Sequence, residues 1–262
     1  MTDLHYDVTG SGPAVCLVHS GVTDSRAWDG QVVALAPSYT VVRYDIRGFG
    51  GSPLPPGPLS HVKDLRELLD ELGVEATTLV GNSFGGRIAL EFALEHPARV
   101  TKLVLVAAAL RDYGWSDEMR NFAEAEDEAM ERGDLDAAVA LNLEMWALPH
   151  VRERVRPMAR TALEVQQAAY ESDSPPEPEP PLDRPASSRL GELGVPTLVV
   201  VGDRDVAHFQ DLGKLFAREI PGASLGRRGC RASAEPRASG RLRSPLAGVP
   251  QSMTADGEPP GR

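Results

Sequence analysis

The chain has 262 residues, of which 42% are hydrophobic, and a formal net charge of −11. This length fits one α/β domain or two small ones, and the apolar content is ample for a sizeable core. The acidic balance argues against nucleic acid or an anionic membrane as the main partner. No apolar stretch is long enough to span a membrane and no signal peptide is recognised, so we expect a cytoplasmic protein.

The first half of the chain alternates between apolar runs and amphipathic stretches. Continuous apolar runs predict buried strands, and apolar residues at helical spacing predict helices between them. Such alternation predicts a mostly parallel sheet with right-handed crossovers. The expected strands are 14–19, 40–45, the apolar run that leads from Thr77 to Gly81, and 100–107. The expected helices are 28–35, 61–72 and 85–95.

The two cysteines, Cys16 and Cys230, provide no disulfide framework. Cys16 lies inside the first apolar run, so we expect it to be a small core residue.

The alternation breaks at about Arg111. Residues 117–171 have only helical patterns, and we interpret the acidic run Glu124 to Glu131 as a solvated helix face. Residues 174–185 contain six prolines and predict a stiff linker. A strand at 197–201 and a helix at 209–220 then resume the pattern. The middle segment is therefore predicted to be an insertion over the carboxyl edge of the sheet, where open α/β sheets bind ligands.

Gly81-Asn82-Ser83-Phe84-Gly85 is a G-x-S-x-G motif between a predicted strand and a predicted helix. A serine hydroxyl is a weak nucleophile, so it needs a tight turn on which a base can reach it. The backbones come close at such an elbow, and glycine avoids the clash that a Cβ would cause. The alternative is an ordinary Gly-rich turn, since short matches to this motif occur by chance.

Three further motifs accompany this elbow. They are His19-Ser20-Gly21 after the first strand, Asp45-x-Arg47-Gly48-x-Gly50-x-Ser52 after the second, and Gly202-x-x-Asp205 after the strand at 197–201. Together with the helical insertion, they resemble the α/β-hydrolase family from about Leu4 to Ala223. The resemblance implies an α/β-hydrolase fold with a helical cap.

The resemblance also implies roles for individual residues. Ser83 is the expected nucleophile, Asp205 the acid of the triad, and the N–H groups of Gly21 and Phe84 the oxyanion hole. Asp203 is a rival for the acid, and Asp205 could alternatively cap the following helix. No metal and no organic cofactor is implied. A serine at the elbow argues against the dehalogenase and epoxide-hydrolase branches, which use an aspartate there.

Several other residues have two interpretations. We expect His19 to tie loops together rather than act as a base, and Arg47 to brace a loop through ion pairs. Phe122, Met145 and Trp146 could line a substrate pocket, although apolar residues at helical spacing are more often core.

The family's histidine follows the last strand, but no histidine follows His208 in this chain. His208 could replace it only if the loop after Asp205 folds back over Ser83. Residues 226–262 have neither strand nor helix periodicity, so we predict a disordered tail. The last strand and helix of the fold are then expected to be missing, which would leave the strand at 197–201 as an exposed sheet edge.

We hypothesise a shifted reading frame after about Leu225. Read one base later, the codons of Gly229 to Ser233 permit the sequence Gly-Ala-Gly-His, although they do not force it. The alternative is a genuine flexible tail, and the nucleotide sequence across Leu225 distinguishes the two.

The sequence thus predicts a hydrolase core at 1–110 and 191–225, a helical cap with a Pro-rich linker at 111–190, and a disordered tail at 226–262. The expected function is hydrolysis of a small ester or related acyl substrate through an acyl-enzyme, with activity in doubt because the triad histidine is absent. The alternative is a non-catalytic binding protein on the same scaffold.

Overall fold

The computed structural model describes residues 2–228. Its strands are β1 (Tyr6–Thr9), β2 (Ala14–Val18), β3 (Thr40–Tyr44), β4 (Gly57–Pro58), β5 (Thr77–Asn82), β6 (Val100–Val106), β7 (Pro176–Glu177), β8 (Thr197–Gly202) and β9 (Ser224–Arg228). Its α-helices are α1 (Asp29–Leu35), α2 (His61–Glu71), α3 (Phe84–Glu95), α4 (Asp117–Glu131), α5 (Leu135–Trp146), α6 (Arg152–Tyr170) and α7 (Ala207–Glu219). Short 3₁₀ helices are η1 (Ser25–Trp28), η2 (Pro97–Arg99), η3 (Pro149–Val151) and η4 (Ala186–Glu192).

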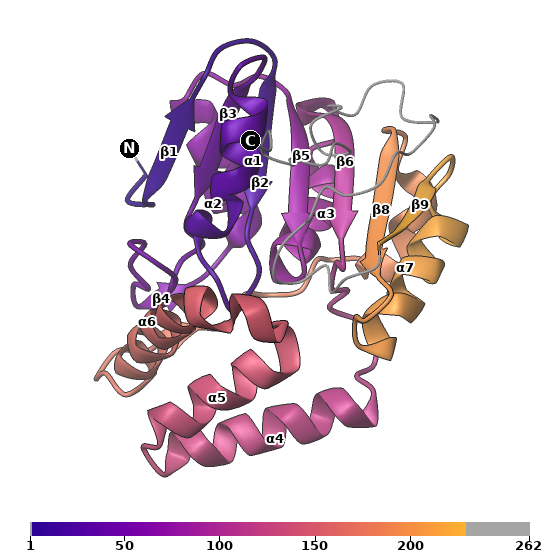
Figure 1. Cartoon of the computed structure of the whole chain (residues 1–262). Coiled ribbons are helices and arrows are strands. Elements are labelled where there is room, and N and C mark those ends of the chain that lie inside the picture. The colour runs from indigo at the N-terminus through magenta and orange to yellow at the C-terminus, as the bar shows by residue number, and fades with distance from the viewer. Residues whose placement is uncertain (1, 229–262) are drawn as a thin grey trace, which may run out of the picture.

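The centre of the molecule is a seven-stranded sheet in the order β1-β3-β2-β5-β6-β8-β9 (Figure 1). Only β1 is antiparallel to its neighbour, and the other adjacent strands are parallel. The predicted mostly parallel sheet is therefore confirmed. Every residue of the central strand β5 is buried, as expected for an apolar run with helices on both faces.

Local sequence explains where the elements begin and end. In α2, the Ser60 side chain accepts a hydrogen bond from the N–H of Lys63, and Gly73 ends the helix region with φ 65°. In β2, Cys16 is fully buried, and burial raises its pKa to about 12. The prediction of a small core residue at this position is confirmed.

The helices α4, α5 and α6 form a helical insertion below the carboxyl ends of the parallel strands (Figure 1). The insertion has a small apolar core of its own, which includes Val139, Leu143 and Val155. The Pro-rich segment that follows is not helical, as predicted, and its strand β7 pairs with β4. Every helix within residues 2–228 is too short or too polar to cross a bilayer.

Strand β9 contradicts one prediction. The last strand was expected to be missing, but Ser224–Arg228 pairs in parallel with β8 from Leu198 to Gly202. The strand at 197–201 is therefore not a sheet edge. Backbone pairing with β8 and the crossover through α7 form β9, although its own sequence has little apolar periodicity. Residues 226–228 of the predicted disordered tail therefore belong to a strand. The rest of the tail, the expected absence of the last helix and the frameshift hypothesis lie outside the described residues.

Candidate active site

Ser83 stands at the junction of β5 and α3 in a strained conformation, with φ 52° and ψ −112°. Its N–H donates to the carbonyl of Val106 at 2.9 Å, and its own carbonyl accepts from the N–H groups of Arg87 and Ala109. A non-glycine residue in such a conformation costs on the order of 1–3 kcal/mol and persists only where its surroundings fix it. The turn therefore has the strained geometry that the motif predicts.

Two glycines allow the elbow to close. A Cβ on Gly81 would lie 2.2 Å from the carbonyl oxygen of Gly85, and a Cβ on Gly85 would lie 2.3 Å from that of His19. Real side chains do not tolerate such contacts. The close backbone approach explains why both positions around Ser83 are glycine.

Gly21 and Phe84 lie next to each other beside Ser83. All three line one pocket, and a Cβ on Gly21 would be 3.5 Å from Cβ of Phe84. Phe84 is the first residue of α3, where the backbone N–H groups have no partners within the helix. Its ring packs against His61 with centroids 5.2 Å apart, which helps to hold this end of the helix.

His19 ties two loops together. Its Nδ1–H donates to the carbonyl of Ser20 at 2.8 Å, and its Nε2 accepts from the N–H of Ile46 at 2.8 Å. Burial lowers the pKa of His19, so the ring is neutral. Both ring nitrogens are engaged, which confirms the predicted structural role.

Arg47 also has the predicted bracing role. Its guanidinium lies 2.8 Å from Asp64 and 2.8 Å from Asp3, so it joins the loop after β3 to α2 and to the N-terminal segment.

The two acids of the turn after β8 differ in exposure. Asp205 is buried and its Oδ2 accepts from the N–H of Gly202 at 2.6 Å, whereas Asp203 is exposed. Asp205 does not cap the next helix, because Val206 occupies the N-cap position of α7. Of the two candidates, Asp205 is thus the buried, hydrogen-bonded acid.

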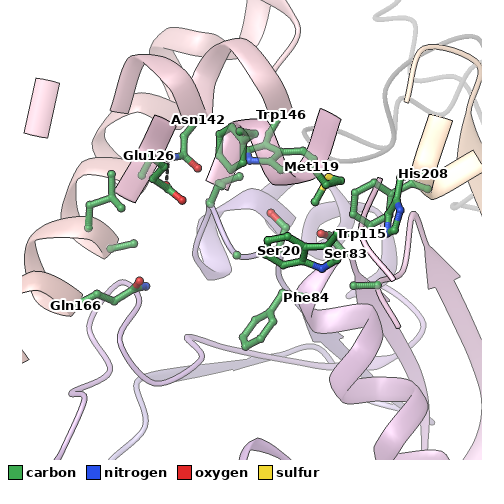
Figure 2. A pocket seen from close by; sticks show the side chains of 18 of the residues that line it. Ser20, Ser83, Phe84, Trp115, Met119, Glu126, Asn142, Trp146, Gln166 and His208 are labelled. Carbon is green, nitrogen blue, oxygen red and sulfur yellow. Dashed lines mark hydrogen bonds between the residues drawn. The ribbon is translucent and has the colours of Figure 1, made fainter. Parts of the chain in front are cut away.

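His208 lies in the first turn of α7 and lines the same pocket as Ser83 (Figure 2). All six histidines are in the described part of the chain, and His208 is the one that lines this pocket. Its ring contacts Tyr113 and Phe209, each with centroids 5.4 Å apart. Burial lowers its pKa, which favours the uncharged imidazole. Within residues 2–228, no hydrogen bond joins this ring to Ser83.

The pocket lies between the sheet edge and the helical insertion and has a volume of about 280 Å³. Phe122 and Trp146 line it, whereas Met145 does not and packs against the main core. Two of the three residues considered for the pocket are therefore in its wall. Glu126 and Asn142 add a polar region on the side away from His208 (Figure 2).

A buried ionic cluster that the sequence did not predict lies behind the elbow. Glu179 of the Pro-rich segment contacts Arg87 of α3 at 2.9 Å and Arg111 at 2.5 Å, and its Oε1 accepts from the N–H of His61 at 2.6 Å. Arg87 also pairs with Glu91 at 3.3 Å. The spacing of Arg87 and Glu91 by four residues was a signal for one pair, but nothing in the sequence connects them to Glu179.

Charges and burial shift the ionisation of this cluster. Burial lowers the pKa of His61 to about 4, since the attraction of Glu179 is outweighed by desolvation and by the cations Arg87, Arg111 and Arg47. Burial alone would raise the pKa of Glu179, but the charge of Arg87 and the hydrogen bond from the backbone N–H of His61 hold it below its usual range. The cluster is therefore stable with a neutral histidine and an ionised glutamate.

Comparison with known proteins places the chain in a family. The family model described as alpha/beta hydrolase fold matches residues 13–224. A putative carbamate hydrolase, RutD, of Caulobacter segnis is 41% identical over 120 residues, which is 42% of this chain and 43% of that protein. A fluoroacetate dehalogenase of Burkholderia sp. is 40% identical over 107 residues, 38% of this chain and 35% of that protein.

The chain thus spans less than half the length of these curated relatives. An enol-lactonase from Burkholderia xenovorans LB400 has a similar structure, with a TM-score of 0.71 over 88% of this chain and 89% of that one, at 24% identity. On the family match and the fold together, the chain belongs to the α/β-hydrolase fold family.

Proposed function

We propose that the chain is a serine hydrolase that acts on a small ester or related acyl substrate. The observation that supports this most is that Ser83, on its strained elbow, faces a pocket also lined by Gly21 and Phe84. In the proposed reaction, Ser83 Oγ attacks the substrate carbonyl, and the N–H groups of Gly21 and Phe84 bind the oxyanion. Residues 111–190 are proposed to act as the cap that selects the substrate.

The proton acceptor in this proposal is His208. Its buried imidazole is uncharged near neutral pH, which is the form that takes the Ser83 proton and then gives it to the leaving group. Asp205, in the turn after β8 and three residues before His208, is the acid proposed to stabilise the imidazolium. Water then attacks the acyl-enzyme and releases the acid. The mechanism calls for no metal or organic cofactor.

The relatives widen the range of substrates that the proposal includes. Their names give a carbamate hydrolase, a dehalogenase and an enol-lactonase, so the bond cleaved differs within the family. For this chain, ester, thioester, lactone and carbon–carbon bonds are all compatible with a serine nucleophile. The acidic net charge supports a small molecule as substrate rather than nucleic acid or membrane lipid, and we propose a cytoplasmic location.

Turnover of short-chain p-nitrophenyl esters tests the proposal. We expect Ser83→Ala and His208→Gln each to lower kcat by on the order of 10³-fold or more, as loss of a triad member does. Equal rates for wild type and Ser83→Ala would overturn the serine mechanism. If Ser83→Ala loses turnover but His208→Gln retains the wild-type rate, Ser83 is still the nucleophile but His208 is not its proton acceptor.

A second candidate function is binding without catalysis. The observation that favours it is that, in residues 2–228, Ser83 has no hydrogen bond to any histidine. A catalytically silent wild type that still binds small esters in this pocket, measured by calorimetry, would support this alternative. Ser83-dependent turnover would contradict it.

A further inference from the structure

The polar end of the pocket is formed by one residue from each of two helices of the insertion. Glu126 comes from α4 and Asn142 from α5, and the amide nitrogen of Asn142 donates to Glu126 Oε1 (Figure 2). The same nitrogen also donates to the carbonyl of Ala138 at 3.0 Å, which fixes the orientation of the amide. Both amide hydrogens are therefore used. Within the described residues, Asn142 Oδ1 and Glu126 Oε2 accept no hydrogen bond, so the pair presents only acceptors to a ligand.

Glu126 differs from the other acids of α4. Glu124, Asp127, Glu128 and Glu131 are exposed, whereas Glu126 is partly buried and lines the pocket. The interpretation of the acidic run as a solvated face is therefore wrong at this one position. Glu126 shares a helix face with Met119 and Phe122, which also line the pocket. Because this face of α4 lines the pocket, the carboxyl group of Glu126 lies at the pocket wall.

The Glu126 carboxylate also lacks a counter-charge. No lysine or arginine in residues 2–228 forms an ion pair with it, and desolvation raises its pKa. The neighbouring wall is aromatic, with Phe122 and Trp146 in edge-to-face contact at 5.2 Å between centroids. A carboxylate and an aromatic wall together favour a cation, because one supplies opposite charge and the other a negative ring face.

We propose that Glu126 and Asn142 form a subsite for a protonated primary amine carried by the substrate of Ser83. The substrate class is then an acyl compound with an ammonium group at the end distant from its reacting carbonyl. This inference rests on the proposed function for its reaction, but the ammonium subsite itself can be tested without turnover. The ammonium group donates hydrogen bonds to Glu126 Oε2 and Asn142 Oδ1. It also supplies the positive charge that no lysine or arginine in residues 2–228 supplies to Glu126.

Two esters of matched size test the subsite in the full-length protein. They are the p-nitrophenyl ester of ε-aminocaproate, which carries the ammonium, and that of heptanoate, which has a methyl group in its place. At neutral pH we expect kcat/KM for the amino ester to be higher by about tenfold, the size of one charge-assisted hydrogen bond. Glu126→Gln keeps the size of the side chain but removes its charge, so this preference for the amino ester should be abolished.

Glu124→Gln is the matched control, because it removes an exposed acid from the same helix. It should keep the preference, whereas an equal loss in both variants would indicate a general charge effect and overturn the subsite. Thermal unfolding of each variant verifies that the insertion is folded. A wild type that shows no preference for the amino ester would also overturn the proposal.

Binding to Ser83→Ala separates the subsite from the reaction. Calorimetry with hexylamine and hexanol should give tighter binding of the amine, again by about tenfold, and Glu126→Gln should remove the difference. If this difference is present while no ester is turned over, the proposed hydrolase function fails and the subsite stands. If esters are turned over and the amine binds no better than the alcohol, the subsite fails and the hydrolase stands.

Discussion

Ser83 is held in a conformation that its side chain does not favour. Hydrogen bonds to Val106, Arg87 and Ala109 fix its backbone at φ 52°, and the glycines on either side allow β5 and α3 to meet there. The strain energy arises from the backbone conformation and from the Cβ at this position, and the hydroxyl does not contribute to it. Stability and chemistry at this residue can therefore be separated by substitution.

We expect Ser83→Gly to be more stable than Ser83→Ala by about 1 kcal/mol. Both remove the hydroxyl, but glycine adopts positive φ freely, and this gain exceeds its greater loss of chain entropy. Urea unfolding of the two variants measures the difference. Ser188, in η4 with ordinary φ, provides the control pair, in which glycine should be the less stable by about 0.5–1 kcal/mol. If the stability difference between the Gly and Ala variants has the same sign at both positions, Ser83 is not strained.

The residues of the elbow could be predicted because a short motif specifies them, whereas the polar end of the pocket could not. Ser83 and Gly21 follow strands and belong to contiguous patterns. Glu126 and Asn142 are 16 positions apart on different helices, and only the packing of α4 on α5 brings them together. A sequence gives the face of each helix but not the rotation at which two helices meet.

At the scale of elements, the Pro-rich segment does more than connect the insertion to the core. Glu179 inserts its carboxylate between Arg87 of α3 and Arg111, and it also accepts from the backbone at the start of α2. One side chain thus joins three segments that are distant in the sequence. Arg87 lies 4.6 Å from the centre of the Phe84 ring, so the cluster contacts the residue that follows Ser83.

We expect Glu179→Gln to lower the free energy of unfolding by about 2–3 kcal/mol. Glutamine keeps the size, but it removes the nearer carboxylate of the buried Arg87 and the partly buried Arg111, so that Glu91 is the counter-charge left to both. Chemical denaturation measures this loss. Glu177→Gln, at an exposed position two residues earlier, should change stability by less than about 0.5 kcal/mol. Equal stability of the two variants would show that the cluster does not stabilise the fold.

Elements with strong patterns could be predicted, and those formed by their neighbours could not. The buried strand β5 and the amphipathic, capped helix α2 both lie where their side chains place them. Strand β1 is mostly exposed and has no apolar run, and β9 contains glycine and arginine. Strand β1 extends the sheet by pairing with β3, and β9 does so by pairing with β8. Their formation therefore depends on the partner strand more than on their own residues.

For the molecule as a whole, His61 lies where the core, α3 and the Pro-rich segment meet. Its ring packs on Phe84, its N–H donates to Glu179, and it begins α2. The pKa of this buried histidine is about 4 in the folded protein, compared with an ordinary value of 6.5. The unfolded chain therefore binds a proton at a pH at which the folded chain does not, and stability falls as pH falls through this window.

The predicted size of this effect follows from the two pKa values. Each unit of difference corresponds to about 1.4 kcal/mol, so His61 accounts for a loss of about 3 kcal/mol between roughly pH 6.5 and 4. Above this window both states carry a neutral ring, and the contribution is constant. Below it both are protonated and no further loss comes from this residue. The lowered pKa of Glu179 causes a further loss of stability, mainly at the acidic end of this pH range.

We therefore expect His61→Phe to have a flatter stability profile than the wild type. Phenylalanine keeps a ring against Phe84 but cannot bind a proton, so the variant should lose about 3 kcal/mol less on going from pH 7 to pH 4. Urea unfolding across this range measures both profiles. His150→Phe replaces an exposed histidine and should follow the wild type. Parallel curves for wild type and His61→Phe would mean that the His61 ring has the same pKa in the folded and the unfolded chain, which would contradict the lowered pKa expected from its burial.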